Sequence, residues 1–184
     1  MKTNLQDYIA IYKAIEPSIC KQIINDFNET QWIKHFYNDP ITKKDTTYKN
    51  DLEISYEQNK YIDYLNNKIK DCVNDYLKNI VPIPFQLQEV SIPRFNRYQI
   101  GTNMKMHYDH IHTLFDGEKK GIPILSILGL LNYEFEGGDF LMLDSKKVQL
   151  ETGDIILFPS NFLYPHAVTT VTKGTRYSFV SWGF

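Results

Sequence analysis

The chain has 184 residues and a formal net charge of −2 at pH 7, and both values limit what it can be. A chain of this length suits one domain with a sizeable hydrophobic core, so we expect a single domain over residues 1–184. The small net charge disfavours binding to nucleic acid through charge alone. No stretch approaches the roughly 20 apolar residues of a membrane span, so we expect no membrane partner.

The N-terminus and the cysteines indicate a reducing compartment. The opening MKTNLQDYIA contains no long apolar run, so we expect no signal peptide. Cys20 and Cys72 fall in predicted helices and lack the CxxC spacing of a redox or metal motif. We interpret them as reduced thiols in or near the core, and we expect a cytoplasmic protein.

The first half of the chain is predicted to be mainly helical. Residues 16–29 have Pro17, a favoured first-turn residue, near their start and carry apolar residues at helical spacing. Residues 36–55 are polar and rich in turn formers, which predicts a loop, a candidate lid over 38–51, and then a short strand. Residues 57–80 predict an amphipathic helix of about six turns. Its apolar face contains Ile62, Leu65, Ile69, Cys72 or Val73, and Tyr76.

From Phe85 onward the pattern changes to short strands. The stretch GIPILSILGLLNYEF is almost continuously apolar, which is typical of a strand covered on both faces. A turn at residues 152–154 separates two further strands, and residues 166–184 predict a hairpin. We therefore predict an α+β protein with a double-stranded β-helix, a cupin-like jelly roll, and N-terminal helices packed against one sheet. Residues 1–84 would be mainly helical support, and residues 85–184 would form the jelly-roll core with the metal site.

A cluster of histidines and an aspartate in KMHYDHIH, residues 105–112, is the first candidate site. His107 and Asp109 are two positions apart, and such positions point the same way on an extended chain. A third ligand must come from elsewhere, and His166 lies at the start of a predicted strand. Two histidines and one carboxylate bind one face of a metal and leave positions open, which is typical of non-haem Fe(II) oxygenases.

Arg176, ten residues after His166, strengthens this interpretation. If the strand from His166 turns at residues 172–174 and returns, Arg176 comes to lie opposite Thr170. That position is four residues from His166, or roughly 13 Å at ~3.3 Å per residue. A five-carbon dicarboxylate could chelate the metal at one end and meet Arg176 at the other, because guanidinium binds carboxylate in a bidentate way. Ser178, on the same strand face, could donate its hydroxyl to that carboxylate.

The motifs as a set resemble a known family. They are RYQIGTNMKMHYDH, GLLNYEFEGGDF and GDIILFPSNFLYPHAVTTVTKGTRYSFVSWGF. In this order they resemble the Fe(II)- and 2-oxoglutarate-dependent dioxygenases, specifically the prolyl 4-hydroxylase-like branch. The resemblance covers the C-terminal half of the chain closely, whereas the N-terminal helical part is similar only in kind.

The resemblance implies a role for each matching residue. His107, Asp109 and His166 would ligate iron. Arg176 would bind the distal carboxylate of 2-oxoglutarate, with Ser178 assisting.

Two aromatic residues and three departures from the family pattern complete this comparison. Tyr98 would hydrogen-bond the cosubstrate or line its pocket, with a packed core tyrosine as the alternative. Trp182 would lie near the metal-side wall or serve core packing. Met104 and Met106 stand where a tyrosine often precedes the first ligand, and Gly129 stands near where some members have a polar contact to the cosubstrate.

The implied reaction is hydroxylation of a substrate carbon, most simply peptidyl proline, with release of succinate and CO2. It would require Fe(II), O2 and 2-oxoglutarate as cosubstrate, and ascorbate is a further candidate. A peptide or protein partner is expected, with a small molecule as the alternative substrate.

Four further residues have no fixed role in this interpretation. His110 and His112 are candidates for the substrate rim, since His110 points away from Asp109 on an extended chain and His112 would overfill the ligand set. Arg94 and Arg97 could reach substrate, although an outward arginine on a strand is usually solvated.

Three other functions remain open. One is a hydroxylase of a free amino acid or small metabolite, and another is a non-catalytic metal-binding jelly roll. The third is a zinc hydrolase, which would use similar ligands. Neither of the last two explains Arg176.

Overall fold

The computed structural model describes residues 4–38, 44–57, 59–83, 85–109, 114–116 and 119–184. His110 and His112 lie outside the described residues, as does part of the candidate lid loop.

The described residues of the first half of the chain contain two α-helices, as predicted, and two short 3-10 helices. They are η1 (Leu5–Tyr8), α1 (Pro17–Asn25), η2 (Asp26–Glu29) and α2 (Ile62–Asn79). α1 begins at Pro17, which is favoured there because the N–H that proline lacks would have no hydrogen-bond partner in the first turn of a helix. α2 has 18 residues, or about five turns, one fewer than predicted. Its buried face is the predicted one and consists of Leu65, Ile69, Cys72, Val73 and Tyr76.

Most strands belong to two antiparallel sheets. The larger sheet, in spatial order, contains β1 (Ala10–Lys13), β14 (Asp154–Pro159), β10 (Leu125–Leu130), β17 (Arg176–Gly183), β6 (Arg94–Tyr98), β5 (Glu53–Ser55) and β2 (Ile33–Lys34). The smaller sheet contains β13 (Lys146–Lys147), β12 (Phe140–Met142), β15 (His166–Val168) and β7 (Met104–His107). Three two-stranded ribbons are β3 (Tyr37–Asn38) with β4 (Asp45–Thr46), β8 (Leu114–Asp116) with β9 (Lys119–Gly121), and β11 (Phe135–Gly137) with β16 (Val171–Gly174).

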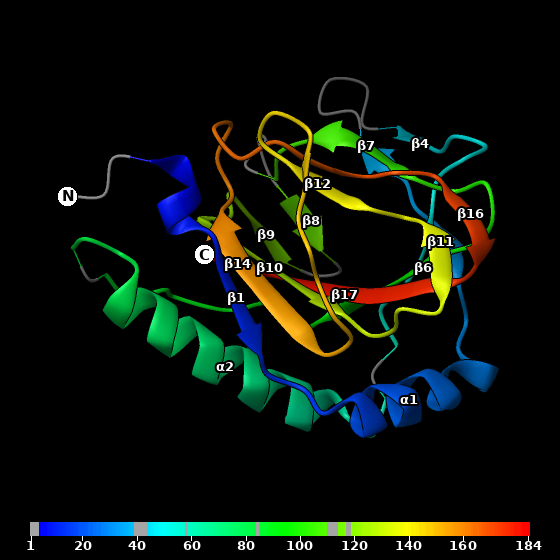
Figure 1. Cartoon of the computed structure of the whole chain (residues 1–184), viewed down its shortest axis with the longest axis horizontal. Helices are drawn as coiled ribbons and strands as arrows, with labels where there is room; N and C mark the ends of the chain where they lie inside the picture. The colour runs from blue at the N-terminus through cyan, green and yellow to red at the C-terminus, as the bar shows by residue number, and fades with distance from the viewer. Residues whose placement is uncertain (1–3, 39–43, 58, 84, 110–113, 117–118) are drawn as a thin grey trace.

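The two sheets face each other, and the helices cover the outside of the larger one (Figure 1). Figure 1 shows α1 and α2 along one side of β14, β10 and β17, with β12 and β7 on the other side. This architecture is the double-stranded β-helix predicted from the sequence. The first half of the chain also contributes β1, β2 and β5 to the larger sheet, so it is more than helical support.

The predicted hairpin over residues 166–184 is wrong. β15 lies in the smaller sheet and β17 in the larger one, and β16 between them pairs with β11 instead. Arg176 therefore pairs with Tyr98 on β6 rather than with Thr170. The reason is burial: β17 is almost wholly buried, so it needs neighbours on both edges, and β10 and β6 supply them.

The predicted turn before β14 is present, but residues 148–150 before it are not a strand, and the preceding strand β13 ends at Lys147. Gly153 occupies this turn with φ of +91°. A Cβ there would lie 1.9 Å from the carbonyl oxygen of Ile15, so only glycine fits.

The central strands of the larger sheet have two faces of different character, because neighbouring residues on a strand point to opposite sides. The outer face packs on the helices and is apolar, with Phe95, Ile127, Ile155 and Phe179 completely buried. The inner face, toward the smaller sheet, carries both apolar residues and the polar residues of the candidate site. The fold thus encloses that site between its two sheets.

Candidate metal centre

The structure brings His107, Asp109 and His166 together. One possible ligand atom from each lies within 4.8 Å of the others. His107 at the end of β7 is paired with His166 at the start of β15, and Asp109 follows two residues after His107. Asp109 Oδ1 lies 3.5 Å from His107 Nε2 and 3.7 Å from His166 Nε2. Neighbouring ends of paired strands therefore create the cluster that the i, i+2 spacing predicted.

Backbone carbonyls orient both imidazole rings. His107 Nδ1 lies 2.7 Å from the carbonyl oxygen of Lys105, and His166 Nδ1 lies 3.2 Å from that of Tyr164. In the neutral tautomer that donates from Nδ1 to these carbonyls, the Nε2 lone pair is free. Nε2 of each ring faces Asp109, so both lone pairs are directed at one point, as a metal site requires.

Asp109 is held by two hydrogen bonds on its other oxygen. Ser126 Oγ donates to Asp109 Oδ2 at 2.6 Å, and Trp182 Nε1 donates to the same oxygen at 3.0 Å. Ser160 Oγ lies 2.8 Å from Ser126 Oγ and extends the network. Oδ2 is thereby occupied, and Oδ1 is the oxygen left for a metal.

The sequence prediction missed Ser126 and Ser160 as supporting residues. Each is a small polar residue in or beside an otherwise apolar, fully buried strand, and that contrast was the available signal.

The protonation states also suit metal binding. Burial acts to raise the pKa of Asp109, but His166, His107 and the hydrogen bond from Ser126 together lower it well below its usual range. Burial lowers the pKa of His166 to about 4, and the charge of Asp109 only partly offsets this. At pH 7 Asp109 is therefore ionised and His166 is neutral, the forms that bind a metal. Burial acts to lower the pKa of His107, but its hydrogen bond to Asp109 and the carboxylate charge raise it overall.

These three donors fit a divalent metal such as Fe(II). The set comprises two imidazole nitrogens and one carboxylate oxygen, converging from one side.

Arg176 is a buried cation between the same two sheets as the cluster of His107, Asp109 and His166. It is 1% exposed, and its Nη1 donates to Ser178 Oγ at 2.9 Å. Its guanidinium lies 5.0 Å over the ring of Tyr98, which is also buried. No carboxylate pairs with Arg176 among the described residues. Burial lowers the pKa of Arg176, but an arginine keeps its charge at neutral pH, so an anionic ligand is needed to balance it.

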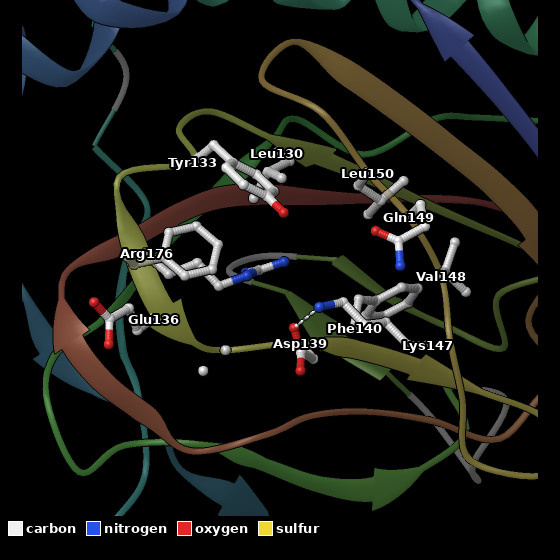
Figure 2. A pocket seen from close by; sticks show the side chains of 13 residues that line it. Leu130, Tyr133, Glu136, Asp139, Phe140, Lys147, Val148, Gln149, Leu150 and Arg176 are labelled. Atoms are coloured by element: carbon white, nitrogen blue, oxygen red, sulfur yellow. Dashed lines mark ion pairs between the residues drawn. The ribbon is translucent and has the colours of Figure 1, made fainter.

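A cavity of about 280 Å³ adjoins Arg176 (Figure 2). Figure 2 shows the Arg176 side chain extending into it, with Tyr133, Gln149 and Phe140 on its wall. The metal-ligand residues do not line this cavity, but the ring of Phe140 lies 5.8 Å from that of His166.

Arg94 and Arg97 differ from the solvated arginines that the sequence suggested. Arg94 points to the inner face of β6 and is buried. Arg97 points to the outer face, where its Nε lies 2.8 Å from Glu53 Oε2 and its guanidinium lies 4.6 Å over the ring of Trp32. The expectation of an outward, solvated side chain was wrong for Arg94, whereas Arg97 faces outward as expected and is only partly buried.

The departures from the family pattern have local explanations. Gly129 is on the outer face of β10, where a Cβ would lie 2.1 Å from the ring of Phe179. It therefore faces away from the metal interior. Met104 Sδ accepts a hydrogen bond from Tyr37 at 3.4 Å, and the side chain of Met106 is exposed.

Comparison with known proteins specifies the family of this chain. The sequence profile of the 2OG-Fe(II) oxygenase superfamily matches residues 93–184. The chain therefore belongs to the 2OG-Fe(II) oxygenase superfamily. The name of the family includes 2-oxoglutarate (2OG) and Fe(II), which are the cofactors predicted from the sequence. In the described part of the chain, no helix is long and apolar enough to cross a membrane.

Related sequences match about half of the chain. A PKHD-type hydroxylase of Psychrobacter sp. (strain PRwf-1) is 35% identical over 96 residues, which are 49% of this chain and 36% of that protein. A PKHD-type hydroxylase of Stenotrophomonas maltophilia (strain K279a) is 38% identical over 95 residues, covering 49% of this chain and 41% of that protein. The matched region thus spans less than half the length of these relatives.

The solved structures share the fold. A prolyl hydroxylase of Trichoplax adhaerens, in complex with a peptide fragment of the hypoxia inducible factor oxygen degradation domain, has a TM-score of 0.73 at 16% identity. That comparison covers 97% of this chain and 84% of the other. The viral collagen prolyl hydroxylase of Paramecium Bursaria Chlorella virus-1 has a TM-score of 0.62 at 14% identity, covering 95% and 94% of the two chains.

Proposed function

We propose that the protein is an Fe(II)- and 2-oxoglutarate-dependent dioxygenase that hydroxylates a substrate carbon and releases succinate and CO2. The observation that carries this proposal is the combination of the His107, Asp109 and His166 cluster with the unpaired buried cation Arg176 in one interior. A zinc hydrolase or a non-catalytic jelly roll would leave the charge of Arg176 without a purpose.

Each residue of the site has a role in this proposal. Nε2 of His107, Nε2 of His166 and Oδ1 of Asp109 would hold Fe(II), which when bound supplies the activation of O2. Ser126 and Trp182 fix the carboxylate of Asp109, so that the same oxygen always faces the metal. Ligands fixed in this way need no rearrangement when the metal binds.

Arg176 and Ser178 would bind the distal carboxylate of 2-oxoglutarate. The guanidinium has donors left after its bond to Ser178, and the serine hydroxyl can in turn donate to the same carboxylate. Tyr98 forms the floor under the guanidinium and limits where it can point. A dicarboxylate suits this arrangement because its second carboxylate is available for the metal.

The apolar side chains around the ligands would exclude water from the reaction. The rings of Phe158 and Phe140 lie 5.0 Å and 5.8 Å from that of His166. A dry wall on this side strengthens the electrostatic contacts within the site and protects reactive species from water.

Peptidyl proline is the first substrate candidate. Support comes from the names of the solved neighbours, which include a prolyl hydroxylase in complex with a peptide fragment. A free amino acid or a small metabolite is the alternative, and ascorbate is a candidate for maintaining the iron. The loop over residues 38–51 would act as a lid beside the substrate.

We extend the proposal to organisation and location. The strands β1, β2 and β5 from the first half belong to the same sheet as β10, β14 and β17, which supports a single domain over residues 1–184. Cys20 and Cys72 are both free and buried, which supports a reducing, cytoplasmic environment.

The test is turnover with defined components. Protein with Fe(II), ascorbate, O2 and 2-oxoglutarate should release succinate slowly without substrate and faster with one. Proline-containing peptides and free amino acids are then screened for a mass increase of one oxygen atom. Absence of succinate in every mixture, together with no binding of 2-oxoglutarate by calorimetry, would contradict the proposal.

A further inference from the structure

Arg94 is a second buried arginine of the interior, and neither the metal ligands nor the cosubstrate anchor uses it. The residue is 9% exposed. Its Nε donates to Asn96 Oδ1 at 3.3 Å, and its guanidinium lies 5.0 Å over the ring of Trp182. No carboxylate pairs with it among the described residues. A buried cation without a counter-charge is destabilising, so Arg94 is expected where a ligand supplies the negative charge.

Arg94 lies at the metal end of the interior. Trp182 links Arg94 to the candidate metal ligand Asp109, because its ring lies under Arg94 and its indole N–H donates to Asp109. Along the paired strands β6 and β17, Arg94 is four positions from the level of Arg176, or roughly 13 Å at ~3.3 Å per residue. Arg94 also does not line the cavity at Arg176. The two arginines therefore suit two different anions.

The charges of the loaded site lead to the same result. With Fe(II) and 2-oxoglutarate bound, the two positive charges of the metal and the one of Arg176 balance Asp109 and the dianionic cosubstrate. The charge of Arg94 remains. A buried site is most stable near neutrality, so one further negative charge should enter with the primary substrate.

His35 is a second buried polar group with a ring nitrogen that lacks a partner, and it lies within electrostatic reach of Arg94. It is 7% exposed, and its Nδ1 is buried without a hydrogen bond among the described residues. Burial, together with the nearby charges of Arg94 and His107, lowers the pKa of His35 to about 3, so the ring is neutral at pH 7. In a neutral imidazole one ring nitrogen donates and the other accepts, and none of the described residues pairs with Nδ1 of His35.

We propose that Arg94 and His35 form a subsite for a carboxylate of the primary substrate. The residue that is hydroxylated is then a free amino acid or the C-terminal residue of a peptide, held by its α-carboxylate. This inference rests on the proposed function and decides between its substrate candidates: an internal peptidyl residue has no α-carboxylate to offer. Trp182 touches both Arg94 and Asp109, so a carboxylate held at Arg94 lies at the end of the interior that contains the candidate metal ligands.

The test compares matched acids and amides. The full chain, loaded with Mn(II) and 2-oxoglutarate, is titrated calorimetrically with L-proline against L-prolinamide. It is also titrated with a peptide ending in proline, with a free or an amidated C-terminus, and the panel is repeated with other L-amino acids. The acid of at least one pair should bind at least about 30-fold more tightly than its amide, as expected for an ion pair in a buried site. The two arms distinguish a free amino acid from a peptide C-terminus.

Substitutions test which residues cause the preference for the acid over the amide. Arg94→Gln should remove the preference for the acid, and Arg94→Lys should restore part of it. Both should leave binding of 2-oxoglutarate within about 2-fold, because Arg176 is unchanged. Arg97→Gln is the matched control: Arg97 is on the same strand but faces outward and pairs with Glu53, so it should leave the preference intact. His35→Ala should weaken binding of the acid less than Arg94→Gln does.

Two results would overturn the subsite. One is the absence of any acid in the panel that binds more tightly than its amide, and the other is an unchanged preference in Arg94→Gln. Either result, with normal binding of 2-oxoglutarate and slow release of succinate, overturns the subsite alone. Loss of both of those properties in the unmodified protein overturns the proposed function as well.

Discussion

The two faces of the larger sheet are made by alternate residues of the same strands, yet they have different tasks. On β17, Phe179 faces the helices, whereas Arg176, Ser178 and Trp182 face the smaller sheet. The outer face packs Phe95, Ile127, Ile155 and Phe179 against the helices, and the inner face contains two arginines without a carboxylate partner in the described structure. Stability and chemistry are thus separated by one position along the chain, so single substitutions can alter one and leave the other.

The largest expected effect is on the outer face. Phe179→Ala should lower the free energy of unfolding by about 3–5 kcal/mol, because it removes a fully buried ring and leaves a cavity. Denaturant unfolding measures this loss. The fraction that stays folded should still bind 2-oxoglutarate with normal affinity. A large loss of that affinity in the folded fraction would show that the two faces are not independent.

The second-largest expected effect follows from a substitution on the inner face. Arg176→Gln should weaken binding of 2-oxoglutarate by about 30-fold or more, since it removes a charged partner in a buried site. It should not lower the free energy of unfolding of the ligand-free protein by a comparable amount, because it also removes an unpaired buried charge. Calorimetry and denaturant unfolding on the same preparation test both statements. Equal losses of stability and affinity would instead indicate misfolding.

A smaller effect is expected for the residues that orient Asp109. Ser126→Ala should weaken metal binding by roughly 10- to 100-fold, as is typical for residues that hold a ligand in place. Ser181→Ala is the matched control, since Ser181 donates to the carbonyl of Ser91 and has no contact with the metal ligands. Competition with a chelating dye gives both affinities. If the two variants bind metal equally well, Ser126 has no role in positioning the carboxylate.

Much of the fold and of the metal centre could be predicted because local periodicity carries that information. Period-two geometry paired His107 with Asp109, and helical periodicity gave the buried face of α2. The apolar run around β10 correctly indicated a strand covered on both faces.

What could not be predicted depends on strand pairing. β15 and β17 are close in sequence but lie in different sheets, and no local pattern distinguishes this from a hairpin. A strand buried on both faces also does not reveal which residues face which side, so Arg94 and Ser126 could not be assigned to the interior. Arg176 is buried, and its strand neighbour is Tyr98 rather than Thr170.

The central claim is that His107, Asp109 and His166 hold one metal ion on which binding of 2-oxoglutarate depends. The most direct measurement is an anaerobic calorimetric titration with Fe(II), followed by 2-oxoglutarate, of the unmodified protein and of His166→Ala. We predict one Fe(II) per chain in the unmodified protein, and loss of both binding events in a folded His166→Ala variant. A folded variant that binds Fe(II) as tightly as the unmodified protein would contradict the account.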